Sequence, residues 1–448
     1  MAGRATTRIQ VSAHRFLMRR MEHALVRADA RMLDDPLRAQ SLSLMAGAVL
    51  TVIAIAVCAV LAFLQPRGDV GNATIVMVRE SGALYVRIGD TMHPAMNLAS
   101  ARLITGATDK PELVSASALA RARRGPLVGI PGAPDTIGAP LGTAELVWTV
   151  CEDDNGITTV LAGTAPPPMD SGANSLVAAR GESAATAYLL YDGRKARVDL
   201  RNPAVVRALK IDGVTPQQVS RALLDAVPEV PEIATPVIAH VGTPSVLPGL
   251  PVGTVVRSTR ADSGEHYVVL GHGVQRVGEV AADLINFAYA HRRDIVTVAP
   301  GLIGNVPIVN ALPVATFPDR GGVAESSALC VRPDAVLTSE TLSLDSDLVQ
   351  LAQADGAGPG VDGFVMPTGR SAFVRATGLS GEGAETGALY LVDDSGVVFG
   401  IRDEEAAGRL GLSDPVPAPW PLLARLPRGP ELSVEGASVG RDSVGPTP

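Results

Sequence analysis

The longest apolar stretch of the chain runs from Leu42 to Leu64, and no charged residue lies between Ala39 and Pro66. About 20 apolar residues in a helix, at ~1.5 Å each, cross the ~30 Å hydrocarbon core of a bilayer. A buried helix of a soluble protein would show a polar face, and a cleaved signal peptide would be shorter and closer to the start of the chain. We therefore predict one transmembrane helix at residues 42–64, followed by a linker at 65–74.

Apolar residues also recur every three or four positions in the preceding segment, residues 1–41, where they alternate with charged residues. This pattern predicts an amphipathic helix over residues 13–32, with Ser12 as its N-cap and Pro36 beyond its end. Its apolar face can lie on the anionic inner leaflet, which the arginines favour, or in a groove of a partner protein. The spacing alone favours neither. The apolar positions are Phe16, Leu17, Met21, Leu25, Ala28 and Met32.

Charge is distributed asymmetrically along the chain. Residues 1–41 hold eight arginines and four acidic residues, a net charge of +4, which leaves −12 for the rest of a chain whose total is −8. Because positively charged flanks stay in the cytoplasm, this asymmetry predicts a cytoplasmic N-terminus and export of everything after Leu64. An acidic exported domain also argues against a nucleic-acid partner.

The exported region repeats a short pattern four times: an apolar strand, a turn rich in Gly and Asp, a second strand and a short helix. The four strands begin at Ala83, Ala187, His266 and Ala388. A further match lies in Leu223-Leu224 and Leu422-Leu423, which are 199 positions apart. We therefore expect a tandem duplication, with halves at residues 75–235 and 236–434 and a disordered tail at 435–448.

Composition agrees with short strands and turns, because aromatic residues make up only 3% while Gly and Pro number 46 and 34. The predicted fold class is thus membrane-anchored α+β. It combines one transmembrane helix with an elongated, β-rich exported domain of four hairpin–helix repeats in two pseudo-symmetric halves.

The two exported cysteines, Cys151 and Cys330, occupy matching places in the two halves, 179 positions apart. If the halves pack about a pseudo-two-fold axis, matching residues near that axis meet, and an oxidising compartment then favours a Cys151–Cys330 disulfide. The alternative is two free, buried thiols. Cys58 lies in the predicted span, where it acts as a small apolar residue.

The sequence shows no pattern typical of catalysis, a cofactor or a metal. The three lysines, Lys110, Lys195 and Lys210, follow Asp, Arg and Leu, so the Gly-Lys-Ser/Thr of a phosphate-binding loop is absent. The glycine-rich stretch 129–134 contains prolines, which lack the amide donors that hold a phosphate. The acidic residues around Ser346 lack the glutamate of a calcium loop, and the seven histidines are scattered. We predict that the chain is no enzyme and binds no cofactor.

Several stretches resemble EccB, the membrane component of actinobacterial type VII (ESX) secretion systems. The resemblance runs from about residue 4 to 434, and it departs from the family pattern at Val331-Arg332-Pro333, where an aromatic residue is expected. The stretches that carry it are 6–12, 14–25, 31–37, 84–86, 93–94, 97–104, 129–134, 148–151 and 228–231.

The resemblance implies a structural subunit of the inner-membrane secretion complex, beside the EccC ATPase, EccD, EccE and the mycosin protease. It favours a partner protein, EccC or EccD, for the face formed by Phe16, Leu17, Met21 and Leu25. It also implies a periplasmic domain after the membrane helix. Association between copies of that domain is a further expectation, and similarity of its repeats to a phage-lysin module suggests peptidoglycan.

Two other functions stay as alternatives at this point. One is a membrane-tethered module that binds the cell wall. The other is an ATPase with an unrecognised site, because some family members carry that label.

The charge asymmetry around the span makes a testable prediction of topology. A reporter that is active only outside the cytoplasm should be active when it is fused after Gly71 and inactive when it is fused at Ala5. Activity of the Ala5 fusion alone would invert the predicted orientation.

Overall fold

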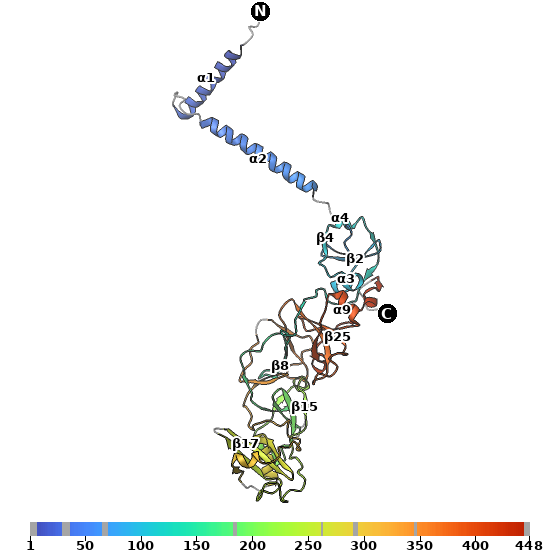
Figure 1. Cartoon of the computed structure of the whole chain (residues 1–448). Helices are drawn as coiled ribbons and strands as arrows, with labels where there is room; N and C mark the ends of the chain where they lie inside the picture. The colour runs from blue at the N-terminus through green and yellow to red at the C-terminus, as the bar shows by residue number, and fades with distance from the viewer. Residues whose placement is uncertain are drawn as a thin grey trace, which may run out of the picture. The chain divides into compact units, whose positions relative to one another are not determined.

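The computed structural model describes residues 7–28, 36–64, 70–181, 186–260, 263–289, 294–344 and 347–442. The chain divides into two units, Met1–Gly71 and Asn72–Pro448. The first unit contains α1 (Arg8–Arg27) and α2 (Pro36–Leu64) (Figure 1). Among the described residues, α2 is the helix that is long and apolar enough to cross a membrane, over Leu42–Val60.

The start of α1 differs from the prediction of a cap at Ser12. The helix begins at Arg8, after Thr7, whose backbone N–H donates to Gln10 Oε1 at 3.1 Å. Thr7 and Gln10 have the spacing of a capping box, in which the two residues satisfy each other's free amides, and this local pairing starts the helix earlier. At the other end, Ala28 has a φ of 54°. The predicted continuation to Met32 lies outside the described residues.

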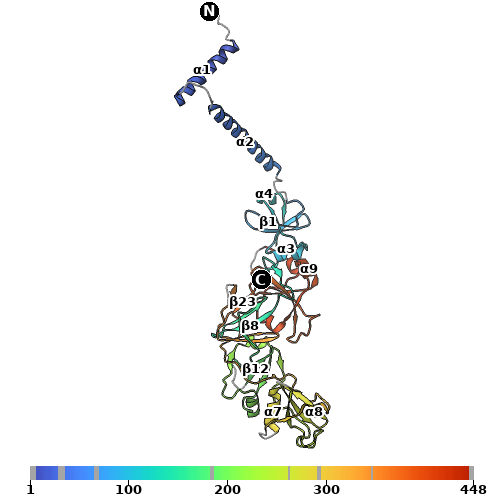
Figure 2. The same ribbon diagram turned by 60° about the vertical axis from the view of Figure 1, so that its left-hand side comes forward.

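The second unit contains four small sheets with a common core of three antiparallel strands (Figures 1 and 2). Sheet 1 comprises β1 (Ile75–Val78), β2 (Leu84–Ile88), β3 (Thr91–Pro94), β4 (Glu112–Val114) and β5 (Arg123–Arg124), with α3 (Leu98–Thr105) and α4 (Ala116–Leu119). Sheet 2 comprises β11 (Ser175–Ala179), β12 (Ala187–Tyr191), β13 (Arg194–Val198), β14 (Gln217–Val219) and β15 (Glu229–Val230), with α5 (Pro203–Ala208) and α6 (Arg221–Asp225).

Sheets 3 and 4 have the same arrangement. Sheet 3 comprises β16 (Val255–Arg260), β17 (Ser263–Leu270), β18 (Gly273–Val277) and β19 (Val296–Val298), with α7 (Glu279–Tyr289) and α8 (Pro300–Gly304). Sheet 4 comprises β24 (Arg370–Thr377), β25 (Leu389–Asp393), β26 (Val398–Ile401) and β27 (Val416–Pro419), with α9 (Glu404–Leu410) and α10 (Trp420–Leu423); β7 (Ala139–Pro140) also pairs with β24.

In each small sheet, a strand that follows the first helix runs parallel to the first strand: β4 on β1, β14 on β11, β19 on β16 and β27 on β24. The four hairpins expected from the sequence are present as the second and third strands. In sheet 2 the turn is Asp192-Gly193, with φ of 44° and 68°. Glycine is required at position 193 for this positive φ, and also because an added Cβ would lie 2.4 Å from the carbonyl oxygen of Pro333.

A central sheet joins chain segments that are far apart in sequence. Its order is β10 (Asp170–Ser171), β21 (Ala335–Ser339), β20 (Ala328–Arg332), β8 (Trp148–Glu152), β9 (Thr158–Ala162), β23 (Gly363–Val365) and β22 (Leu348–Gln350). The middle pair, β8 and β20, is antiparallel and places Cys151 directly opposite Cys330. Their Cα atoms are 4.0 Å apart and the two residues form a disulfide, as predicted.

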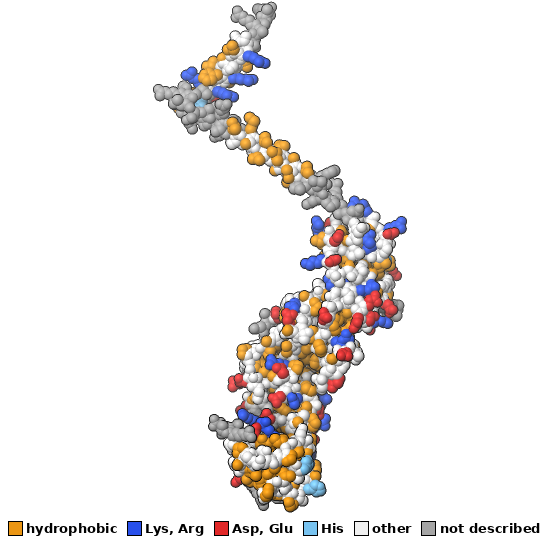
Figure 3. Space-filling view, viewed as in Figure 1, with side chains coloured by type: hydrophobic (Ala, Val, Ile, Leu, Met, Phe, Trp, Pro, Cys, Tyr) orange, Lys and Arg blue, Asp and Glu red, His pale blue; other side chains and the backbone are white. Residues whose placement is uncertain are grey.

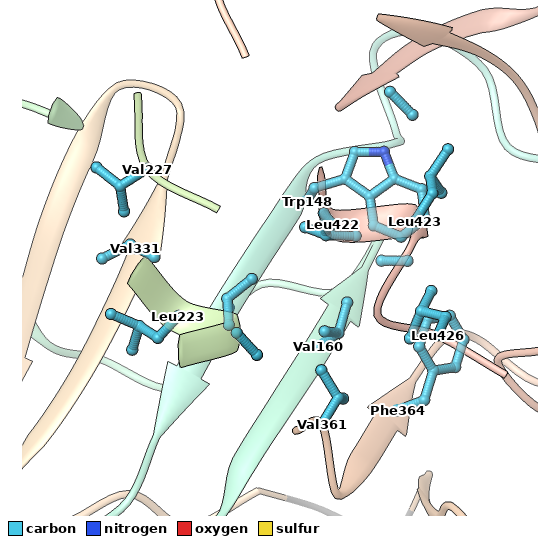
Figure 4. Packing of buried hydrophobic residues seen from close by; sticks show 14 of the residues in the cluster. Trp148, Val160, Leu223, Val227, Val331, Val361, Phe364, Leu422, Leu423 and Leu426 are labelled. Carbon is cyan, nitrogen blue, oxygen red and sulfur yellow. The ribbon is translucent and has the colours of Figure 1, made fainter. Parts of the chain in front are cut away.

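The alternation of side chains in β8 gives the central sheet two apolar faces. On one face, Trp148 and Val150 pack with α6, α10 and the inner faces of sheets 2 and 4, and Figure 4 shows Leu223, Leu422 and Trp148 in this core. The other face carries the disulfide and a smaller cluster. Its members include Cys151, Leu161, Cys330, Leu337 and Val365, covered by Met169, Leu342 and Leu344.

The small sheets also pack in pairs through their helices. Sheets 1 and 4 share a core in which α3 lies against α9, and both cartoon views show the two helices side by side (Figures 1 and 2). Arg102 of α3 donates to the carbonyl of Leu410 at 3.1 Å, and Arg409 of α9 donates to the carbonyl of Leu103 at 3.0 Å. Each arginine thus binds a carbonyl near the end of the other helix. Sheets 2 and 3 share a core through α5 and α7.

The chain beyond residue 434 differs from the predicted disordered tail. It forms α11 (Val434–Ala437) and β28 (Gly440–Arg441), and β28 pairs with β6 (Leu127–Val128). Ala437 is fully buried in the core shared by sheets 1 and 4. The burial of Ala437 and the pairing of β28 with β6 give this segment its structure. Neither contact can be predicted from the segment's own polar and glycine residues. Residues 443–448 lie outside the described part.

A buried ion pair connects the central sheet with sheet 2. The Glu152 side chain is 2% exposed and binds Arg180, and its second oxygen accepts the backbone N–H of Ser220 at 2.7 Å. Arg180 also donates to the carbonyls of Gln218 and Gly358. The carboxylate and the guanidinium therefore both have hydrogen bonds beyond their mutual contact, which is the condition under which a buried pair is tolerated.

The disulfide can be tested by substitution. Cys151→Ser and Cys330→Ser should lower the melting temperature of the second unit equally, and the double variant should lose no more, because either change breaks the same bond. In the chain-entropy model a loop of this length contributes about 4–5 kcal/mol. Mass spectrometry that finds both thiols alkylatable in the unreduced, denatured protein would disprove the bond.

The buried ion pair makes a separate prediction. Arg180→Gln leaves the Glu152 carboxylate buried without its counter-ion and should lower the free energy of unfolding by about 3–5 kcal/mol. The matched control is Arg201→Gln, which breaks a surface pair with Asp199 and should change nothing measurable. Urea unfolding of the second unit compares the two variants, and equal effects would contradict the prediction.

Candidate functional site

The apolar stripe predicted in residues 1–41 lies on the surface of α1. Leu17, Met21 and Leu25 are four residues apart and lie along one side of the helix, and Phe16 lies about 100° around the helix from Leu17. Their exposed fractions lie between 55% and 86%. Figure 3 shows hydrophobic and basic side chains together on the surface of α1. An apolar stripe of this kind on a surface marks a contact with another molecule or with lipid.

The basic residues of α1 are also at the surface. Arg15, Arg19 and Arg20 are exposed on the same helix as the apolar stripe. Their positions are compatible with an anionic leaflet, and the stripe is compatible with a groove on a partner protein. The geometry of α1 by itself accommodates both alternatives that the sequence left open.

Two ionisable groups of sheet 2, Tyr191 and Lys195, are buried against other segments of the chain. Burial raises the pKa of Tyr191 to about 12, and its hydroxyl donates to the carbonyl of Thr316 at 2.6 Å. Burial lowers the pKa of Lys195, whose Nζ donates to the carbonyl of Leu224 at 2.7 Å. Each contact holds a side chain of sheet 2 against another segment of the chain. These perturbed groups therefore act in packing and do not converge on a reactive centre.

Residues that hold the second unit together were only partly identified from sequence. The predicted cysteines meet, and both are fully buried, so their bond is a structural link. Arg102, Arg409 and Glu152 were missed. Glu152 could have been recognised from the sequence, because it is a charged residue at the end of a mostly apolar strand. Arg102 and Arg409 lie in the last turns of their helices, where a basic side chain interacts favourably with carbonyl groups that have no partner within a helix.

Neither a cluster of metal ligands nor a phosphate-binding lysine motif is found among the described residues. Within the described ranges, no three His, Cys, Asp or Glu residues gather closely enough to hold a metal ion. The lysine contexts of the sequence exclude a phosphate-binding loop of the Gly-Lys-Ser/Thr type. The described residues form a β-rich unit held by internal contacts and a separate helix, α1, whose apolar stripe is exposed.

Comparison with known proteins agrees with this description. The family described as "Type VII secretion system ESX-1, transport TM domain B" matches residues 3–446. The "ESX-5 secretion system ATPase EccB5" of Mycobacterium tuberculosis (strain H37Rv) is 35% identical, covering 98% of this chain and 94% of that protein. The "ESX-3 secretion system ATPase EccB3" of Mycolicibacterium smegmatis is 34% identical, covering 99% and 92%.

Solved structures give the same result. A chain of an intact ESX-5 inner membrane complex superposes with a TM-score of 0.67 at 32% identity, covering 100% of this chain and 98% of that chain. A chain of an EccB3 dimer from the ESX-3 core complex has a TM-score of 0.67 at 30% identity, covering 82% and 100%. The chain therefore belongs to the EccB family of type VII secretion proteins.

Proposed function

We infer that this chain is a structural core subunit of the inner-membrane type VII secretion complex. The observation that carries this conclusion is the match over the whole chain to a subunit of an intact ESX-5 inner membrane complex. The fold agrees with a scaffold, because its buried polar groups serve packing and its apolar helix α2 suits an anchor. Copurification in detergent with a large multi-subunit complex tests the assignment, and recovery of the chain alone would contradict it.

The membrane topology follows from the charge asymmetry. The N-terminus and α1 lie in the cytoplasm, α2 crosses the inner membrane once, and residues 72–448 lie in the periplasm. Support comes from the eight arginines before the span and from the disulfide, which needs an oxidising compartment.

The exported unit is a tandem duplication with halves at 75–235 and 236–434. Three features support it. Cys151 faces Cys330 across the middle of the central sheet. Sheets 1 and 2 share the parallel strand order of sheets 3 and 4. The helices α6 and α10, which follow equivalent strands of sheets 2 and 4, contact each other, and Asp225 pairs with Arg425 between them.

Two other functions have weaker support. Relatives are named ATPases, but this sequence lacks the lysine motif of a phosphate-binding loop. Nucleotide turnover by the purified exported unit would establish that alternative. A wall-binding module rests on analogy of the repeats alone, and binding of the exported unit to isolated peptidoglycan would support it.

The partner of α1 is the cytoplasmic part of another subunit, EccC or EccD. The apolar stripe at Phe16, Leu17, Met21 and Leu25 supports a groove contact, because burial of these four side chains removes large apolar surfaces from water. Contact between EccE or the mycosin and the periplasmic unit belongs to the same proposal.

Substitutions in α1 distinguish a protein groove from a lipid surface. Leu17→Glu with Met21→Glu places charges in the contact, and each unpaired buried charge costs several kcal/mol. We expect this pair to abolish complex assembly and secretion, measured by copurification and by export, while membrane insertion and the Cys151–Cys330 bond persist.

The matched control replaces charge and keeps the apolar stripe. Arg15→Gln with Arg19→Gln should leave assembly largely intact if a groove binds α1. Leaflet binding predicts the reverse, because each arginine near an anionic surface contributes about 1 kcal/mol. Loss of assembly in the arginine pair, with normal assembly of the Leu17 and Met21 pair, would contradict the groove.

A further inference from the structure

Sheet 1 differs in charge from the rest of the second unit. Residues 72–128, which contain this sheet and its helices, hold seven basic and four acidic residues, a net charge of +3. Residues 129–448 carry a net charge of −15. Figure 3 shows blue side chains around the part of the unit that sheet 1 occupies in Figure 1. The second unit therefore combines a small basic part with a large acidic remainder.

Four arginines of sheet 1 gather around α4. Arg79 follows β1, and its backbone N–H donates to the carbonyl of Val114, two residues before α4, at 2.9 Å. Arg121 follows the other end of α4, and Arg123 and Arg124 form β5 at the edge of the sheet. All four arginines are exposed, and within the described part of the chain none of them forms an ion pair. Because a helix of four residues is only ~6 Å long, the four define one basic surface, which we call the α4 surface.

Two carboxylates lie close to this surface and do not neutralise it. Glu80 accepts the backbone N–H of Ala116, the first residue of α4, at 3.0 Å. Asp90 is exposed and precedes Thr91, which pairs with Arg123. Four arginines against these two acidic residues leave a local net charge of +2.

Charged residues at the corresponding position of sheets 2 and 4 have partners within the chain. Strand register places Arg124 at the position of Glu229 in sheet 2, and Glu229 binds Arg197 at 2.9 Å. In sheet 4, Arg428 lies beside the third strand, and its guanidinium is 4.7 Å from the centre of the Trp420 ring. The positive charge of sheet 1 is thus left for a partner outside the chain.

The helix at the centre of this surface is also less covered than its counterparts. The helices that correspond to α4 in sheets 2 and 4 are α6 and α10, which contact each other in the large core. Ala118 and Leu119 of α4 are buried on sheet 1 but belong neither to that core nor to the core shared by sheets 1 and 4. Ala116 and Ser117, on the outer side of α4, are exposed.

The length of the chain limits the distance between the α4 surface and the bilayer. Ten residues separate Leu64, the end of α2, from Ile75, the start of β1. A connection of this length spans at most about 40 Å. In the proposed topology α2 crosses the inner membrane, so sheet 1 is the small sheet that lies nearest along the chain to the periplasmic membrane surface. A tether of this length keeps the two surfaces at a high effective concentration.

We propose that the α4 surface, formed by Arg79, Arg121, Arg123 and Arg124, binds anionic phospholipid headgroups of the periplasmic leaflet of the inner membrane. The guanidinium groups donate hydrogen bonds to the phosphate oxygens. The acidic remainder of the second unit is repelled by the same leaflet, so the contact orients the unit with sheet 1 towards the membrane. The inference rests on the proposed function, because it requires α2 in the membrane and the second unit in the periplasm.

Side-chain type favours lipid headgroups over other occupants. Protein interfaces carry apolar or aromatic residues at their centre, whereas the exposed residues of α4 and its flanks are arginine, alanine and serine. Sugars are bound through aromatic rings, and the α4 surface has none. Clusters of basic residues close to a membrane span are typical of contacts with anionic lipid.

Fluorescence quenching in nanodiscs tests the contact with the full-length protein. A fluorophore on Ser117→Cys, in a Cys58→Ser background, reports its distance from lipids with a nitroxide on the headgroup. Discs of phosphatidylcholine with about one-third phosphatidylglycerol should quench it several-fold more than discs of phosphatidylcholine alone. The difference should disappear in ~1 M salt, where the Debye length falls to ~3 Å. Equal quenching in the two kinds of disc at low salt would overturn the proposal.

Neutralising the arginines tests which residues make the contact. Arg121→Gln with Arg123→Gln and Arg124→Gln should remove the effect of phosphatidylglycerol, because each arginine near an anionic surface contributes about fivefold to binding. Quenching that stays as strong as in the wild type would contradict the assignment of these residues. The Cys151–Cys330 bond reports that the variant folds.

The matched control removes the same net charge from other parts of the second unit. Arg201→Gln with Arg207→Gln and Arg320→Gln replaces three exposed arginines outside sheet 1 and should leave the quenching unchanged. An equal loss in both triple variants would show an effect of total charge and would disprove the local contact.

Copurification separates this inference from the proposed function. A wild-type chain that copurifies with the secretion complex but shows no effect of phosphatidylglycerol would leave the scaffold function standing and disprove the lipid contact. Loss of another subunit from the Arg121, Arg123 and Arg124 variant, with unchanged quenching in anionic discs, would assign the surface to a protein and also disprove the lipid contact. Failure of the wild-type chain to copurify would contradict the function itself.

Discussion

The pairing of β8 with β20 is the constraint on which the second unit depends. It joins strands that are 179 residues apart at their cysteines, and it places Trp148 and Val150 on one face of a sheet that neither chain segment could build alone. A two-stranded hairpin is at best marginally stable in water. Joining the hairpins β8–β9 and β20–β21 edge to edge creates a surface wide enough for sheets 2 and 4 to pack on.

The small sheets depend on one another in a similar way. Each offers a few apolar residues and one or two short helices, which bury too little surface for independent stability. Pairing solves this problem: α3 packs with α9 and α5 with α7, so that the two sheets of each pair share one core. The hydrogen bonds of Arg102 and Arg409 fix how the two helices of the first pair are oriented, because each guanidinium donates to a carbonyl near the end of the other helix. Rigidity of this kind suits a protein whose task is to hold other subunits in place.

The sequence predicted the features that are encoded locally or by a strong physical rule. The apolar span is unmistakable between Leu42 and Leu64, and Asp192-Gly193 marks its hairpin because few residues tolerate a positive φ. Matching positions of Cys151 and Cys330 pointed to their bond. First strands such as β1 and β16 were not predicted, because a short apolar run does not indicate which later strand of the chain it pairs with. Residues 435–442 were misjudged for the same reason, since their order comes from Ala437 and β6.

The pairing of β28 with β6 has a consequence for how the protein is made. It connects Arg441 with Leu127, so the fold closes only when nearly the last residues of the chain have arrived. In the proposed topology, sheet 1 therefore lacks its final partners until the end of the chain has been exported. Sheet 1 must also wait for sheet 4, whose helix α9 completes their shared core. Long-range closure of this kind makes folding slow relative to local hairpin formation. A chain that ended before Ala437 and β28 would leave sheet 1 without these two partners.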